Sequence, residues 1–105
     1  MSMNNGPQVL EPPKVHKDAD WHQTFEPQWQ VILYNDEVHS FDEVVGMIQS
    51  VFNHPLEVAI KIVKEAHISS RAIADVLSKE EAVLKKQLAE KCTPPFTMGL
   101  EQISL

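Results

Sequence analysis

The fold of this chain is decided by residues 29–45, which read WQVILYNDEVHSFDEVV. The run from Trp29 to Tyr34 is apolar, and successive side chains of a strand point to opposite faces. Val31 and Leu33 fall on one face and Ile32 on the other, so both faces carry apolar groups. This pattern predicts a strand at the centre of a small sheet.

A turn with polar side chains follows this strand. Asn35 and Asp36 favour turns because their side chains bond the local backbone, so we expect the strand to end there. Ser40 stands three residues before Glu43, which is the spacing of a capping box at the start of a helix. The turn at residues 35–39 is therefore held at both ends and presents an amide, two carboxylates and an imidazole. Binding groups concentrate on loops held by rigid elements, so this turn is the candidate recognition site.

Two helices are predicted after the turn. Apolar residues at helical spacing predict the first from about Phe41 to Phe52. Pro55 disfavours helix at the residue before it and suits the start of a new helix, which we expect to run to about His67. The two apolar stripes are Phe41, Val44, Val45, Ile48 and Phe52, and Ala59, Ile62, Val63 and Ala66.

The second half of the chain adds two strands and a helix. Residues 71–77 read as a strand, and Ser78 with Glu81 repeats the capping-box spacing. The third helix is expected to run to about Cys92, with Leu84 and Leu88 in the core, and residues 96–103 alternate as a last strand. The order β-α-α-β-α-β predicts a small two-layer α/β sandwich, in which three helices cover one face of a three-stranded, mostly antiparallel sheet.

Residues 1–28 differ in composition from the rest. They carry four prolines and apolar residues at no fixed period, which predicts a flexible tail before a folded domain at 29–105. Trp21 and Phe25 are the aromatic residues of this tail. They could dock on the domain or contact a partner, and the first interpretation is favoured.

Charge and cysteine content exclude several classes of function. The formal net charge is −6, whereas a nucleic-acid binder needs a basic patch. An acidic body favours cationic partners, including the free α-ammonium group of another chain. Cys92 is the single cysteine, so no intrachain disulfide or cysteine zinc cage is expected. No membrane span or signal peptide is recognisable, and we expect a cytoplasmic monomer.

The turn and its surroundings resemble a known family. The run Val31-Ile32-Leu33-Tyr34-Asn35-Asp36-Glu37, the helix start at 41–45, the pattern Ala59-x-x-Ile62-x-x-x-x-His67 and Ser78-Lys79-Glu80 are similar to the ClpS-type adaptors of the Clp protease. The resemblance covers about residues 29–90. It implies an adaptor without enzymatic activity or cofactor. Such an adaptor binds the N-terminal residue of N-degron substrates (Leu, Phe, Tyr or Trp) and delivers them to a ClpA- or ClpC-like AAA+ unfoldase.

The resemblance also implies a role for particular residues. The α-amino group of the substrate would be held by Asn35, Asp36 and His67, and the peptide backbone by Glu37 and His39. The hydrophobic pocket for the first side chain would draw on Ile32, Leu33, Phe41, Val44, Val63 and Phe96. Contact with the unfoldase would fall on Glu80 and Lys85.

The chemistry of these residue types agrees with that role. An α-ammonium group offers three donors and no acceptor, so its site must supply acceptors such as an amide oxygen, a carboxylate and a neutral imidazole nitrogen. A purely structural interpretation stays open, in which Asn35 and Asp36 only form the turn and His67 compensates the dipole of a helix end.

The chain departs from the family pattern at the site itself. His39-Ser40 stands where Thr-Pro is usual, Phe41 replaces the gating Met, and Ser70 replaces a Gly. One alternative is therefore an interaction module of the same fold that has lost N-terminal residue recognition. A hydrolytic or metal site from Asp36, His39 and His67 is the weaker rival, because no ligand spacing or nucleophile motif is present.

Overall fold

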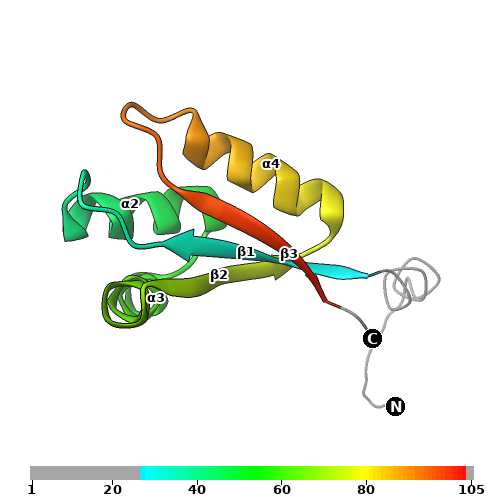
Figure 1. Ribbon diagram of the computed structural model, residues 1–105, viewed down its shortest axis with the longest axis horizontal. Helices are drawn as coiled ribbons and strands as arrows, with labels where there is room; N and C mark the ends of the chain where they lie inside the picture. The colour runs from blue at the N-terminus through cyan, green and yellow to red at the C-terminus, as the bar shows by residue number, and fades with distance from the viewer. Residues whose placement is uncertain (1–26, 104–105) are drawn as a thin grey trace, which may run out of the picture.

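The computed structural model describes residues 27–103, so Trp21, Phe25 and nearly all of the predicted tail lie outside the described part. The elements follow one another in the predicted order, as Figure 1 shows. They are β1 (Gln28–Tyr34), α2 (Phe41–Phe52), α3 (Leu56–Ser69), β2 (Arg71–Leu77), α4 (Lys79–Glu90) and β3 (Met98–Ile103).

The three strands form an antiparallel sheet in the order β2-β1-β3. The central position of β1 confirms the prediction made from its two apolar faces, because Val31, Ile32 and Leu33 are all at most 1% exposed. Leu33 pairs with Ala72 of β2 and Met98 of β3. The sheet prediction is thus confirmed, with every pairing antiparallel.

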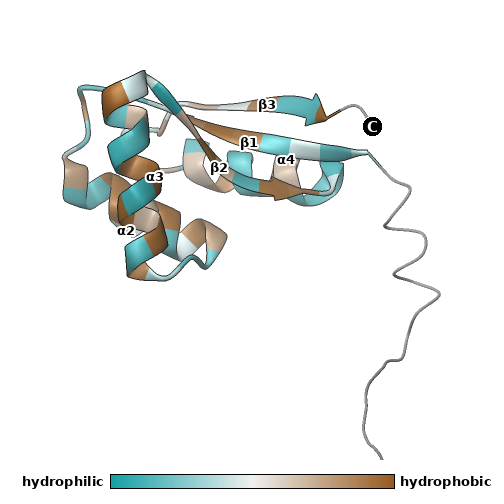
Figure 2. Ribbon diagram, turned by 90° about the horizontal axis from the view of Figure 1, so that it is seen from below, coloured by the Kyte–Doolittle hydropathy of each residue, from teal (hydrophilic) through white to brown (hydrophobic). Residues whose placement is uncertain are grey.

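The helices pack on one face of this sheet. One hydrophobic cluster joins Val31 and Leu33 of β1 to buried residues of all three helices. Figure 2 shows α4 running alongside the strands, and α2 and α3 gathered at one end of the sheet. The helix residues of this core are Val45, Met47, Ile48 and Phe52 of α2, Ala59, Val63 and Ala66 of α3, and Ala82 and Ala89 of α4.

The opposite face of β1 is covered differently. Ile32 lies between Gln30 and Tyr34 on this face, and these two residues pair with Glu101 and Arg71 respectively. Arg71 Nη2 and Glu101 Oε1 are 3.2 Å apart, so this ion pair between the two edge strands spans the central strand above Ile32. Ile32 is therefore buried away from the helices.

One core prediction was wrong. Leu84 and Leu88 are 51% and 41% exposed, whereas α4 buries Ala82 and Ala89. The two alanines are seven residues apart and so lie on one side of the helix, two turns from each other. Their small side chains allow α4 to pack closely on the sheet, which leaves the two leucines on its outer side.

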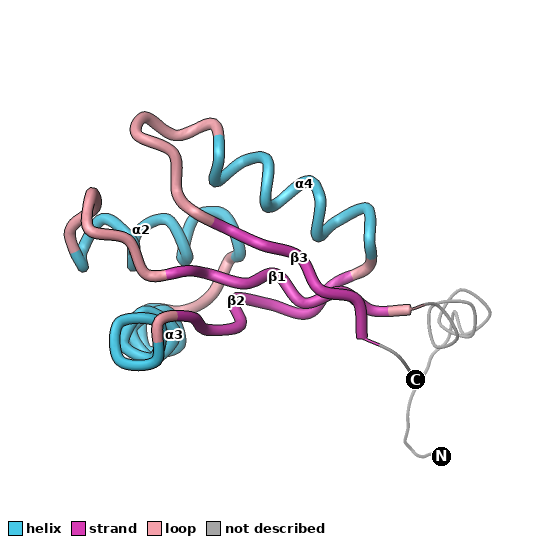
Figure 3. The backbone as a smooth tube through the Cα atoms, viewed as in Figure 1, coloured by secondary structure: helices cyan, strands magenta, loops and turns pink. Residues whose placement is uncertain are grey.

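The turn after β1 is built as predicted. Ser40 Oγ accepts from the Glu43 N–H, and Glu43 Oε1 accepts from the Ser40 N–H, so the capping box is complete. Figure 3 shows the loop after β1 and the loop before β3 at the same end of the sheet. This end carries the candidate site.

Candidate functional site

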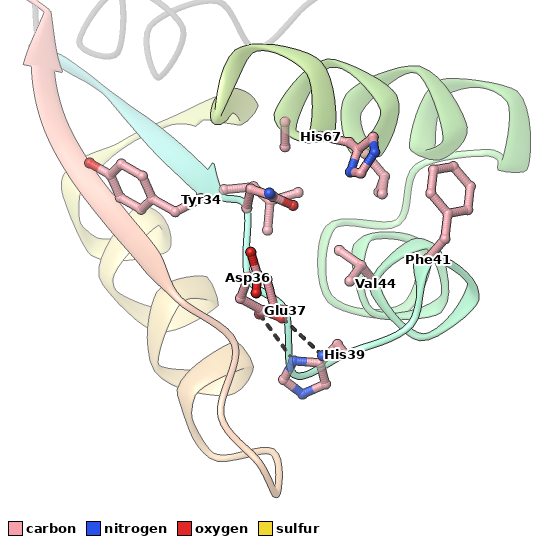
Figure 4. A pocket seen from close by; sticks show the side chains of 11 residues that line it. Tyr34, Asp36, Glu37, His39, Phe41, Val44 and His67 are labelled. Atoms are coloured by element: carbon pink, nitrogen blue, oxygen red, sulfur yellow. Dashed lines mark hydrogen bonds and ion pairs between the residues drawn. The ribbon is translucent and has the colours of Figure 1, made fainter.

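A cavity of about 490 Å³ opens between the end of β1, the turn that follows it, and helices α2 and α3. Figure 4 shows the cavity with its side chains. It is lined by Leu33, Tyr34, Asn35, Asp36, Glu37, His39, Phe41, Val44, Val63, Ala66 and His67.

Asp36 folds the turn around its own side chain. Its Oδ1 accepts the backbone N–H of Val38 at 3.0 Å and that of His39 at 2.9 Å, and its Oδ2 lies 3.1 Å from His39 Nδ1. Burial of the carboxylate would raise its pKa. The hydrogen bonds from His39 and Val38 outweigh that effect and lower the pKa of Asp36. The group is therefore an anion at neutral pH.

His39 joins the turn to the segment before β3. Its Nε2 lies 2.8 Å from the carbonyl oxygen of Pro94, and its ring stacks on Phe96 with centroids 3.8 Å apart and planes at 13°. The side chain is 4% exposed. Burial disfavours the charged ring. The hydrogen bonds to Asp36 and Pro94 and the charges of Asp36 and Glu43 prevail and raise the pKa of His39.

The rest of the cavity is apolar with a second polar group opposite the turn. Leu33, Val44, Val63 and Ala66 form its walls. Phe41, at the start of α2, is 42% exposed, and His67 projects from α3 toward the hollow that Asp36 and Glu37 face from the turn (Figure 4). The cavity thus places hydrogen-bonding groups beside apolar walls.

Most residues predicted for the site line this one cavity. Asn35, Asp36 and His67, expected to hold an α-amino group, are among them, although His67 is far from the turn in sequence. The backbone N–H of Asn35 donates to the carbonyl oxygen of Ser70 at 3.0 Å, which holds the end of α3 against the end of β1. Tyr34 and Ala66 also line the cavity and were not predicted, and their only signal is adjacency to Asn35 and His67.

Two predicted pocket residues lie elsewhere. Ile32 does not line the cavity, because strand alternation turns it to the sheet face opposite Leu33. Phe96 packs behind His39 and lines a smaller hollow of about 290 Å³ instead. The ring of His39 therefore separates Phe96 from the predicted pocket.

The predicted unfoldase residues lie on α4, which contributes nothing to the cavity lining. Glu80 is exposed in the first turn of α4, and Lys85 is half-buried. Between residues 27 and 103, no group of His, Cys, Asp or Glu side chains could hold a metal ion. No helix in that range is long and apolar enough to cross a membrane.

Comparison with known proteins defines the class of protein. The model of the family "ATP-dependent Clp protease adaptor protein ClpS" matches residues 24–101. The structure of Agrobacterium tumefaciens ClpS2 bound to L-phenylalaninamide superposes with a TM-score of 0.67 at 20% identity, over 73% of this chain and 98% of that one. The small α/β fold is therefore shared.

Curated ClpS adapter proteins are similar in sequence. The protein of Leptothrix cholodnii is 29% identical over 83 residues, which are 79% of this chain and 61% of the relative. The protein of Xanthomonas campestris pv. campestris is 37% identical over 59 residues, which are 56% of each chain. The matched parts thus span less than two thirds of these relatives. The chain belongs to the ClpS family, which confirms the resemblance noted from the turn and helices.

Proposed function

We propose that this protein is an adaptor that binds the free N-terminal residue of substrate chains and delivers them to a Clp AAA+ unfoldase. The first residues it accepts are bulky and hydrophobic: Leu, Phe, Tyr or Trp. The observation that carries the proposal is one cavity in which Asn35, Asp36 and His67 adjoin apolar walls. Membership of an adaptor family supports the same role.

The polar side of the cavity suits an ammonium group. The Asn35 amide oxygen, the Asp36 carboxylate and a neutral His67 nitrogen are acceptors, and an α-ammonium group has three donors to satisfy. Hydrogen bonds to charged groups contribute roughly 1.5–3 kcal/mol each. An acetylated N-terminus loses the charge and most of the donors, so the site should discriminate strongly against it.

The apolar side suits one large side chain. A cavity of about 490 Å³ falls within the usual range for small-ligand sites, which are mostly apolar with a few placed polar groups. Burying a Leu or Phe side chain contributes roughly 1.5–3 kcal/mol. The structural neighbour binds L-phenylalaninamide, an aromatic residue with a free amino group. We therefore expect micromolar or tighter binding of Phe- or Leu-led peptides.

Delivery would use a different surface. Glu80 and Lys85 on α4 are proposed to contact the N-terminal domain of a ClpA- or ClpC-like unfoldase. The exposed pair Leu84 and Leu88 lies on the same helix and adds apolar area beside these charges. Residues 1–28 are proposed to engage the unfoldase as a tail, so that their removal weakens delivery and spares peptide binding.

Fluorescence anisotropy with a short Phe-led peptide tests the proposal. Asp36→Asn keeps an acceptor for the turn N–H groups but removes the charge, so we expect at least tenfold weaker binding. Asp42→Asn removes one charge from an exposed position outside the cavity and is the matched control. The wild type should bind the acetylated peptide more weakly than either variant binds the free peptide. Equal affinity for free and acetylated peptides would favour the alternative, an interaction module without end recognition.

A further inference from the structure

The hydrogen-bond partners of His39 favour its protonated form. Nε2 lies 2.8 Å from the Pro94 carbonyl oxygen, which only accepts. Nδ1 lies 3.1 Å from Asp36 Oδ2, which also only accepts when ionised. An imidazole donates from both ring nitrogens only as the cation, so this pair of acceptors favours the protonated ring. The side chain of His39 is 4% exposed, and its ring lies beside a carboxylate of the proposed binding site.

Asp36 has little capacity left once these contacts are made. Its two oxygens accept from the Val38 N–H, the His39 N–H and the His39 ring. A carboxylate has about four lone-pair sites, so about one remains for a ligand donor. The direction of that remaining site is set by the three donors already in place.

We propose that His39 is a positioning residue for recognition of the N-terminus: its ring orients Asp36 toward the ligand, and its charge sets how strongly Asp36 attracts the α-ammonium group. This inference rests on the proposed function and deepens it. No other residue with a side chain in the cavity bonds the Asp36 carboxylate through that side chain within residues 27–103.

Loss of the His39 proton has a definite consequence. A hydrogen bond to a carboxylate is stronger than one to a carbonyl. The neutral ring therefore keeps its proton on Nδ1, retains the hydrogen bond to Asp36 and loses the one to Pro94. Asp36 keeps its orientation, while the positive charge beside it disappears. Binding of an α-ammonium group then becomes tighter, by roughly three- to tenfold for a unit charge a few Å away at a partly exposed site.

Other titratable groups surround the ring. They are Asp36 in the same turn, Glu43 on α2, Cys92 after α4, and Glu37 and His67 across the cavity. The substrate's own α-amino group also titrates near pH 8. All of these are identical in the wild type and in a variant changed only at position 39. A comparison between the two therefore isolates His39.

The experiment measures the affinity of one Phe-led peptide from pH 6 to pH 8 for the wild type and for His39→Asn. The Asn amide can donate to Asp36 but cannot ionise. We expect wild-type affinity to rise with pH by about three- to tenfold relative to the variant. Parallel profiles would overturn the inference and leave the proposed function intact. Absence of peptide binding by both proteins at every pH would overturn both.

A second measurement needs no variant. Linkage is reciprocal, so a ligand that binds better to neutral His39 must lower the pKa of His39 when it binds. NMR titration of the His39 ring, with and without saturating peptide, reports that pKa directly. We expect a lower pKa in the complex, and an unchanged or higher pKa would overturn the inference.

Discussion

The Ser70 carbonyl oxygen accepts the backbone N–H of Asn35 at 3.0 Å. This bond joins the residue after α3 to the residue after β1, and it brings His67 to the cavity that Asn35 and Asp36 also line. The geometry of Ser70 is left-handed, with φ of 76°. A strained residue therefore fixes the distance between the two polar parts of the site.

Replacement of Ser70 by Gly should stabilise the protein. A side chain in the left-handed region costs roughly 1–2 kcal/mol that Gly does not incur, and Gly is the usual residue at this position after a helix. After the entropy cost of Gly in the unfolded chain, we expect about 0.5–1 kcal/mol higher free energy of unfolding in urea. Ser69→Gly, inside the last turn of α3, is the control and should destabilise. A loss of stability in Ser70→Gly would contradict this reading.

The Asp36–His39 pair should stabilise the fold within a window of pH. The pKa of Asp36 is lowered from its ordinary value of 3.8. Its contribution is therefore fully present above 3.8 and is lost as the pH falls through the lower folded value. The pKa of His39 is raised from 6.5. Its contribution is fully present below 6.5 and is lost as the pH rises through the higher folded value.

The two effects overlap between pH 3.8 and pH 6.5. The difference in unfolding free energy between the wild type and His39→Asn should be largest there and should shrink toward pH 9. Urea unfolding at a series of pH values measures it. If this free-energy difference grew from pH 6 to pH 9, it would contradict the stabilising effect expected from the raised pKa of His39.

The first residue of the ligand should be unbranched at Cβ. Phe41 stands at the start of α2 beside the cavity and has a rigid ring, so it cannot repack as a Met could. Val- and Ile-led peptides should therefore bind at least tenfold more weakly than Leu- or Phe-led ones. Phe41→Ala should reduce this ratio, whereas Val38→Ala, at an exposed position outside the cavity lining, should leave it unchanged. Equal binding of Val- and Leu-led peptides would exclude a narrow entrance.

The proposed unfoldase surface on α4 should affect delivery without affecting peptide affinity. Lys85→Glu reverses one charge of the proposed unfoldase surface, and we expect several-fold slower degradation of a Phe-led substrate by an unfoldase and protease supplied with this adaptor. Lys61→Glu reverses an exposed charge on α3 and is the control. If both variants slow degradation equally, the effect is one of net charge, and α4 is not the docking surface.

The sequence by itself predicted the elements and their order. The apolar run with apolar groups on both faces predicted the central strand, and the Ser40–Glu43 spacing predicted the start of α2. Local rules suffice for these features because capping and side-chain periodicity depend on residues a few positions apart. The same rules failed at Leu84 and Leu88, because i,i+4 leucines indicate an apolar stripe without saying which side of the helix meets the sheet.

The tertiary structure decided what the site contains. Turn residues and His67 are brought together by the pairing of strands and by the Asn35–Ser70 bond, which no local pattern encodes. The placement of Phe96 depended on His39, whose ring fills the space between Phe96 and the cavity. The sequence determined which chemical groups are available, and only packing between distant segments decided which of them face one another. The physical reason is that side-chain direction follows local backbone geometry, whereas proximity follows from burial of the whole core.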